Sequence, residues 1–322
     1  MPVISSQKFH HWYSDQKQFF ARRPIVWSLP LVASLLHLLF AHLTTGIRGE
    51  YFFAHAALLL PAYLGANGRR YTVLMFPLWL TGVSYDNFRF VEPFRGAIHV
   101  DDIYHAELAW FGIHYGGDLL TPSHFLTHFR NSFFDVICGI AYIVYMFTVF
   151  IYGVYLLRRQ RHTELFQLAW GFYLVNLLGL LTYLLFPAAP PWYVDLYGLG
   201  PADLTVPPDP AGTIFFDQIT GIHYFEAFYS RNANVFGAMP SLHVAYPMFV
   251  FMFARRSGKA WGISMFLFTL LVAFSAVYFR HHYVWDAVVG ALYGIIGGLI
   301  ASTWIKMPKS LDLTAVSPNS VG

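Results

Sequence analysis

The chain has 322 residues, of which 57% are hydrophobic and 11% are charged, and its mean hydropathy is +0.48. Average soluble domains are about 45–50% apolar and about 25% charged. This composition therefore excludes a soluble globular or disordered protein and indicates a membrane protein. The net charge of +3 is too small to indicate nucleic-acid binding, and a single cysteine, Cys138, excludes an intrachain disulfide.

Eight stretches without a charged side chain are long enough, or nearly so, to cross a bilayer core of about 30 Å as helices. In chain order they cover residues 24–47, 51–68, 71–85, 136–157, 165–194, 232–254, 260–279 and 287–305. The sequence therefore predicts an all-α, polytopic membrane protein with about eight transmembrane helices. The third stretch is the shortest, and six or seven spans remain an alternative.

The basic residues predict the orientation of these spans. With eight spans, both termini and three loops lie on one side, which carries 14 of the 20 Lys and Arg residues: Lys8, Lys17, Arg22, Arg23, Arg69, Arg70, Arg158, Arg159, Arg161, Arg255, Arg256, Lys259, Lys306 and Lys309. Because cytoplasmic segments carry the excess of Lys and Arg, we expect both termini in the cytoplasm. The long connections 86–135 and 187–240 then face the periplasm or a lumen.

The two long connections differ in pattern. Residues 99–115 place apolar side chains at helical spacing beside several charges, which indicates an amphipathic helix along the membrane interface. An ordinary surface helix of the outer loop is the alternative. Residues 187–210 are rich in Pro and Gly and are expected to be irregular.

Two histidines are predicted to emerge on the outer side of the membrane. His243 opens one span and His282 precedes another, and one crossing separates them. Asp286 follows His282 by four residues, so on a helix the carboxylate can accept a ring N–H and leave the other nitrogen as a nucleophile or base. His281 pairs by the same spacing with Trp285, which cannot accept that bond. Structural hydrogen bonds of interfacial histidines are the alternative interpretation.

The residues before His243 favour a helix start that binds an anion. Pro240 suits a first turn and Ser241 a cap. Free N–H groups at such a start attract phosphate.

These motifs carry a resemblance. The run Pro240-Ser241-Leu242-His243, followed by His282 and Asp286, resembles the second and third motifs of the type-2 phosphatidic acid phosphatase superfamily. Within it the chain resembles the inositol phosphorylceramide synthase branch, known from fungal aureobasidin-sensitive enzymes and bacterial relatives.

Three details favour that branch. Leu242 stands where the phosphatases usually have Gly, and the segment Phe186–Tyr193 resembles a Pro-Pro-Trp-Tyr segment of the synthases. Asp135 and Tyr142 resemble an Asp-x6-Tyr pattern of the same branch, although Tyr142 by itself is expected to serve packing. The resemblance covers residues 86–305, about two-thirds of the chain.

The resemblance implies a six-helix core and a domain order. We expect a cytoplasmic segment over 1–23, peripheral transmembrane helices over 24–85, the catalytic membrane domain over 86–305 and a cytoplasmic tail over 306–322.

The chain also departs from the phosphatases. Their Lys-x6-Arg-Pro motif is absent, and Ser275-Ala276 stands where a Ser-Arg pair is expected. Arg280, Arg231 and Arg130 are the outer-side arginines that could replace this phosphate clamp.

The resemblance implies a reaction and its residues. His282 would attack phosphatidylinositol, Asp286 would hold its ring, and His243 would protonate the diacylglycerol oxygen. A phosphohistidine would form, and a ceramide hydroxyl would then accept the phosphoinositol. The expected partners are these two lipids, with no nucleic acid, no metal and no cofactor; an accessory subunit cannot be read from the sequence.

Three further residues are candidates for substrate binding. Asp135 either hydrogen-bonds inositol hydroxyls or caps a helix, and Trp192 and Tyr193 either stack on a headgroup or anchor the chain at the membrane interface.

Two other functions compete with this interpretation. A lipid phosphatase acting on phosphatidic acid or a polyprenyl pyrophosphate would use the same histidines with water as the acceptor. A transporter would use the histidines as a proton relay, but the sequence lacks the internal repeats that many transporters have.

Overall fold

The computed structural model describes residues 10, 13, 14, 17, 24–230 and 234–308. The chain divides into two compact units, Met1–Leu80 and Thr81–Gly322. Each unit is described by itself.

The first unit contains helices α2 (Pro24–Thr44) and α3 (Gly49–Tyr63), which pack on each other, and the start of α4 (Ala66–Asn87). The predicted stretch 71–85 is thus part of a helix of 22 residues. Within this unit, Nδ1 of His37 lies 3.0 Å from Nε2 of the buried His55.

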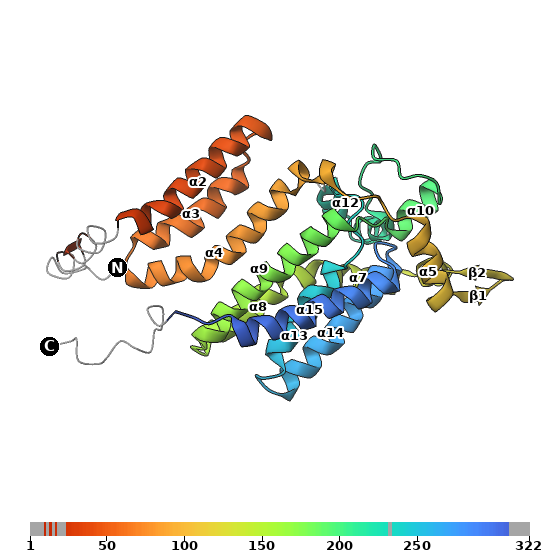
Figure 1. The fold of residues 1–322 in the computed structure, drawn as a ribbon. Helices are drawn as coiled ribbons and strands as arrows, with labels where there is room; N and C mark the ends of the chain where they lie inside the picture. The colour runs from red at the N-terminus through yellow and green to blue at the C-terminus, as the bar shows by residue number, and fades with distance from the viewer. Residues whose placement is uncertain (1–9, 11–12, 15–16, 18–23, 231–233, 309–322) are drawn as a thin grey trace. The chain divides into compact units, whose positions relative to one another are not determined.

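The second unit is a helical bundle with short elements on its outer connections (Figure 1). Between α4 and the bundle lie two 3₁₀ turns, helix α5, a hairpin and helix α6: η1 (Phe88–Phe90), η2 (Glu92–Phe94), α5 (Asp101–Phe111), β1 (Ile113–Tyr115), β2 (Asp118–Leu120) and α6 (Pro122–Thr127). The bundle itself is formed by α7 (Ser132–Val144), η3 (Tyr145–Phe147), α8 (Thr148–Arg158), α9 (His162–Leu185), α13 (Leu242–Ala254), α14 (Lys259–Tyr278) and α15 (Val284–Trp304). Between α9 and α13 lie α10 (Pro191–Tyr197), η4 (Ala211–Thr213), α11 (Ile214–Thr220) and α12 (Tyr224–Tyr229).

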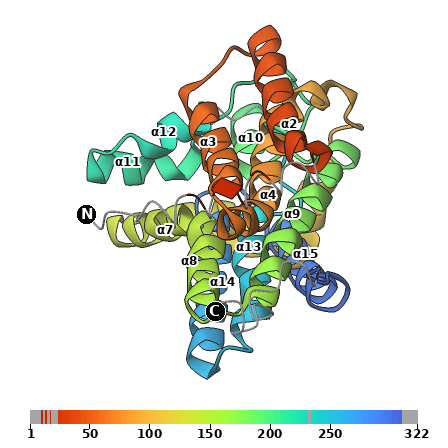
Figure 2. The same ribbon diagram turned by 90° about the vertical axis from the view of Figure 1, so that its left-hand side faces the viewer.

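Helix α13 is the centre of the bundle and contacts α8, α9, α14 and α15 (Figure 2). Three glycines of α15 allow α13 to approach α15 closely. A Cβ atom at Gly290 would lie 2.2 Å from the carbonyl oxygen of Ser241, one at Gly294 would lie 2.6 Å from that of Ala245, and one at Gly298 would meet Met252. Small residues four positions apart permit such backbone contact between membrane helices. This contact holds the start of α13 beside the start of α15.

Among the described residues, four helices are long and apolar enough to cross a membrane: Ser132–Arg158, His162–Leu185, Lys259–Tyr278 and Val284–Trp304. Pro30–Thr44 and Leu242–Ala254 are shorter apolar helices. A mostly helical, integral membrane protein is therefore confirmed.

The structure differs from the predicted elements in three places. In the predicted stretch 232–254, the described residues, which begin at 234, become helical only at Leu242. The expected irregular segment 187–210 contains the short helix α10. The predicted helix over 99–115 ends at Phe111, and the hairpin β1–β2 follows, with Ile113 opposite Leu120. Tight turns at Gly116 and Gly117, which have positive φ angles, favour the hairpin over a longer helix.

Candidate active site

His243 and His282 lie against each other at the junction of α13 and α15. Nδ1 of His243 is 3.0 Å from Nε2 of His282. Nδ1 of His282 donates to the carbonyl oxygen of Ala238 over 2.8 Å. Because a carbonyl can only accept, neutral His282 carries its proton on Nδ1 and keeps a lone pair on Nε2. The nitrogen of His282 that faces His243 is therefore the one that carries the lone pair.

Asp286 is fully buried one turn into α15 and lies beside the same ring. Its Oδ2 atom is 3.6 Å from Nδ1 of His282 and accepts the backbone N–H of Tyr283 over 2.7 Å. The expected hydrogen bond between Asp286 and His282 is thus longer than a usual N–H···O bond of about 2.7–3.2 Å, because Ala238 is the nearer acceptor. The Oδ1 atom of Asp286 has no hydrogen-bond partner among the described residues.

His243 is the first of four aromatic rings in a stack, which orients its imidazole. Tyr142 of α7 lies parallel to His243 at 4.2 Å between ring centroids and also stacks on His281 at 5.7 Å. His281 in turn stacks on Tyr229 at 4.4 Å. The ring of Tyr142 therefore contacts a candidate catalytic residue, a role that helical periodicity could not reveal because it depends on how α7 meets α13.

His281 is a neutral, structural member of this stack. Its Nε2 atom donates to the carbonyl oxygen of Pro210 over 3.1 Å. Burial, with a smaller contribution from His282, lowers the pKa of His281 to about 3. His281 is thus uncharged at neutral pH.

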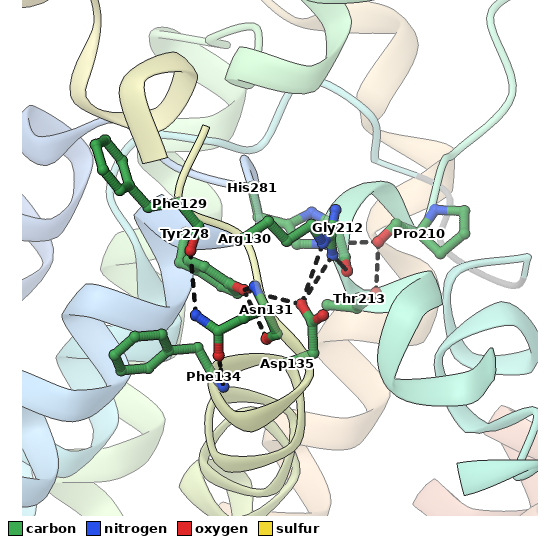
Figure 3. Close-up of polar contacts among 10 residues, drawn as sticks. All are labelled: Phe129, Arg130, Asn131, Phe134, Asp135, Pro210, Gly212, Thr213, Tyr278 and His281. Atoms are coloured by element: carbon green, nitrogen blue, oxygen red, sulfur yellow. Dashed lines mark hydrogen bonds and ion pairs between the residues drawn. The ribbon is translucent and has the colours of Figure 1, made fainter. Parts of the chain in front are cut away.

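Arg130 and Asp135 form a separate cluster at the start of α7 (Figure 3). Oδ1 of Asp135 accepts from Arg130 over 3.1 Å and from the hydroxyl of Tyr278 over 3.0 Å. Arg130 also donates to the carbonyl oxygen of Gly212 over 2.6 Å. We call these four residues the arginine cluster.

Asp135 does not cap α7, and its Oδ1 atom lies within the arginine cluster. Its carboxylate is held by protein donors, and the cap of α7 is Asn131, which accepts the N–H of Phe134 over 3.1 Å (Figure 3). Arg130, an arginine offered as a clamp substitute, is likewise held by a protein carboxylate.

Arg280 lies on the loop that carries His282, with its backbone in the left-handed region at φ 62°. Its guanidinium donates to Asp195 of α10 over 2.9 Å, and its carbonyl oxygen accepts the N–H of Trp192 over 3.0 Å. The loop is therefore tied to α10 by one ion pair and one backbone bond. Arg231 lies outside the described residues.

Trp192 and Tyr193 are buried in a core of the outer connections rather than at an open surface. The hydroxyl of Tyr193 accepts the backbone N–H of Asp203 over 2.8 Å. Both residues therefore support the fold of this connection.

Ser241 precedes α13 as its cap residue but makes no capping bond with its side chain. Its backbone N–H donates to the carbonyl oxygen of Asp286 over 2.9 Å, and its buried hydroxyl has no partner among the described residues. This N–H is therefore not free to bind a phosphate, and it ties α13 to α15 instead.

Comparisons with known proteins identify the family of this chain. The family model described as the PAP2 superfamily matches residues 118–300. The phosphoinositol dihydroceramide synthase of Bacteroides thetaiotaomicron is 33% identical over 273 residues, which are 84% of this chain and 89% of the relative.

Fungal relatives match over shorter segments. The inositol phosphorylceramide synthase catalytic subunit of Schizosaccharomyces pombe is 32% identical over 42% of this chain and 32% of the relative. That of Saccharomyces cerevisiae is 30% identical over 56% of this chain and 45% of the relative. No solved structure matches. The chain therefore belongs to the PAP2 superfamily and, within it, to the branch of the inositol phosphorylceramide synthases, which are phosphotransferases.

Proposed function

We propose that this protein transfers a phosphoinositol headgroup from phosphatidylinositol to ceramide or a related lipid alcohol through a phosphohistidine on His282. The observation that carries the proposal is the 3.0 Å contact between Nδ1 of His243 and Nε2 of His282. The names of the relatives support the choice of lipids.

In the first step, Nε2 of His282 attacks phosphorus and the bond between phosphorus and the diacylglycerol oxygen breaks. His243, protonated, supplies the proton to that oxygen. A phosphorus atom does not fit between nitrogens 3.0 Å apart, so His243 has to turn aside when the donor binds. His243 is half-buried, whereas His282 is buried and held at Nδ1, so His243 is the ring that moves.

In the second step, the ceramide hydroxyl attacks phosphorus, passes its proton to His243, and the bond between phosphorus and Nε2 breaks. Asp286 lies close enough to stabilise the imidazolium that forms on His282. Transfer rather than hydrolysis requires that water be kept from the phosphohistidine. The connection that contains α10 is the candidate cover, because it is tied to the loop of His282 through Trp192 and Asp195.

We also propose the membrane arrangement that the sequence predicts. It has eight spans, both termini in the cytoplasm and the histidine pair on the periplasmic or lumenal side. The domain bounds are 1–23, 24–85, 86–305 and 306–322, and α5 lies along the outer interface. Cysteine accessibility at the ends of the predicted spans, in sealed vesicles, tests this arrangement: modification of position 308 from the outer side would contradict it.

The transfer reaction is tested with purified protein in vesicles that contain phosphatidylinositol labelled at phosphorus, with and without ceramide. The expected result is a labelled phosphoinositol lipid that requires ceramide, and an acid-labile label on the protein when ceramide is omitted. Release of inorganic phosphate, or of inositol phosphate with no labelled acceptor lipid, would indicate a phosphatase or hydrolase and overturn the proposal.

A further inference from the structure

Glu107 of α5 is a fully buried carboxylate that lies at the start of α15. Its Oε1 atom accepts the backbone N–H of Val284 over 2.8 Å, and its Oε2 atom accepts that of Trp285 over 3.3 Å. These are the first two residues of α15. The first N–H groups of a helix have no partner within the helix, and a carboxylate placed there also interacts favourably with the helix dipole.

The start of α15 is also where the candidate site is built. His282 precedes the helix by two residues, and Asp286 closes the first turn by accepting the N–H of Tyr283. Glu107 and Asp286 therefore accept the N–H groups that have no partner within the helix at this start. Asp286 accepts that of Tyr283, and Glu107 accepts the next two along the chain. A shift of α15 would move Asp286 relative to Nδ1 of His282, which is already 3.6 Å away.

Helix α5 contacts the surroundings of His282 at a second point. Ile103 and Tyr104 pack with Tyr283 and with Ala238, whose carbonyl oxygen accepts the Nδ1 proton of His282. On the other side of Glu107, Phe111 packs against Trp285 at 5.4 Å between ring centroids. One helix thus contacts both the acceptor of the His282 proton and the helix that carries Asp286.

We propose that Glu107 is a positioning residue for the transfer reaction, which holds Asp286 and His282 in register by accepting the first two N–H groups of α15. The inference rests on the proposed function, because it concerns the same two residues. Glu107 lies outside the region that the family model matches, residues 118–300, so the membrane core receives this support from an added outer helix.

The ionisation of Glu107 links this support to pH. Burial, together with the neighbouring Asp286, raises the pKa of Glu107 to about 7, although the two backbone N–H groups oppose the shift. Further titratable groups at this junction are Tyr283, Tyr104, Asp195 and His282. Only the carboxylate form accepts both N–H groups, because protonation converts one oxygen into a donor. Protonation of Glu107 as the pH falls through about 7 is therefore expected to weaken its hold on the start of α15.

The test compares Glu107→Gln, Glu107→Asp and the control Asp101→Asn, which changes an exposed carboxylate on the same helix. Log kcat/KM is measured against pH for transfer from phosphatidylinositol to ceramide. In Glu107→Gln we expect kcat/KM at pH 8 to fall about tenfold, since one N–H loses its acceptor. We also expect the slope of log kcat/KM between pH 6 and pH 8 to become shallower than in the wild type, because Gln does not titrate. Asp101→Asn should match the wild type. Glu107→Asp, which keeps the charge but is shorter by one methylene, should keep the steeper slope and lose part of the rate.

A helix cap without influence on the reaction would lower the amount of folded protein but leave the slope unchanged. An unchanged slope in Glu107→Gln therefore overturns the inference, and if that variant does not fold, a wild-type rate in Glu107→Asp does so. Hydrogen exchange at Val284 and Trp285, which needs no turnover, should accelerate in Glu107→Gln but not in Asp101→Asn. An inactive wild type with this exchange difference would overturn the proposed function, whereas an active wild type with an unchanged slope would overturn the role of Glu107 alone.

Discussion

Two polar clusters lie at helix ends of the bundle: the arginine cluster at the start of α7 and the histidine pair at the junction of α13 and α15. They differ in which of their atoms still lack a strong hydrogen-bond partner. The arginine cluster uses Oδ1 of Asp135 to accept from two protein donors and uses Arg130 to donate to a carboxylate and a carbonyl. In the histidine pair, Nε2 of His282 meets only another imidazole, and Oδ1 of Asp286 has no partner among the described residues. Charged residues near a membrane surface are thus not equivalent: groups that are already satisfied support the fold, whereas a lone pair held in place without a strong partner can react.

Substitution of the histidine pair is expected to have the largest effect on activity, in contrast to substitution of the arginine cluster. His282→Ala removes the nucleophile, so transfer of labelled phosphoinositol should fall at least about 10³-fold, and the acid-labile protein label should vanish. His243→Ala should cost a comparable factor, and the double variant should cost little more than either single one, because the residues act as a unit. His114→Ala, on the exposed strand β1, is the matched control and should keep wild-type turnover. Full turnover in His282→Ala would refute the assignment.

His281, which stacks on Tyr142 beside His243, predicts a loss of stability in acid. The folded protein keeps His281 neutral down to about pH 3, whereas the unfolded chain takes up a proton near pH 6.5. Stability is therefore lost as the pH falls from 6.5 toward 3, by an amount on the order of 4 kcal/mol from this residue. His281→Gln can still donate to Pro210 but cannot titrate, so its thermal midpoint in detergent should fall less with acid than that of the wild type. Equal pH dependence in both proteins would contradict this account.

Asp135 tests whether the arginine cluster is structural. Asp135→Ala leaves Arg130 without its carboxylate, which should lower the free energy of unfolding by about 3 kcal/mol, because breaking a buried pair strands a charge. The activity of the fraction that remains folded should change little. The double variant Arg130→Ala/Asp135→Ala should be destabilised by less than the sum of the two single variants. A purely catalytic loss in Asp135→Ala, with wild-type stability, would instead place Asp135 in substrate binding.

Tyr142 predicts the smallest effect. Its ring, rather than its hydroxyl, contacts His243, so Tyr142→Phe should remain within about twofold of the wild type. Tyr142→Leu removes the stacked ring and should lower kcat/KM about tenfold, which corresponds to about 1.4 kcal/mol, the upper part of the range for an aromatic contact. If Phe and Leu behave alike, ring stacking does not orient His243.

Part of the site was predictable from the positions of its residues along the sequence. The pairing of His243 with His282 follows from one membrane crossing between two motifs, and Asp286 follows from a spacing of four. The acceptor of the His282 proton, Ala238, could not be predicted, because a backbone carbonyl has no sequence signature. The partner of Asp135 was equally hidden, since Arg130 precedes it by five residues, a spacing that does not predict an ion pair, and Arg130 also donates to the distant carbonyl oxygen of Gly212.

The sequence by itself determined that the chain is helical, that it belongs in a membrane, and which residues carry its family motifs, because hydropathy, helical spacing and residue identity are local properties. Only the tertiary structure decided which polar groups are already satisfied. It buried Trp192 and Tyr193 in the outer connections, used the N–H of Ser241 to join two helices, and brought Glu107 to a helix 177 residues further along the chain. The physical reason is that the availability of a lone pair or an N–H group depends on every neighbour in space, and most of those neighbours are distant in sequence.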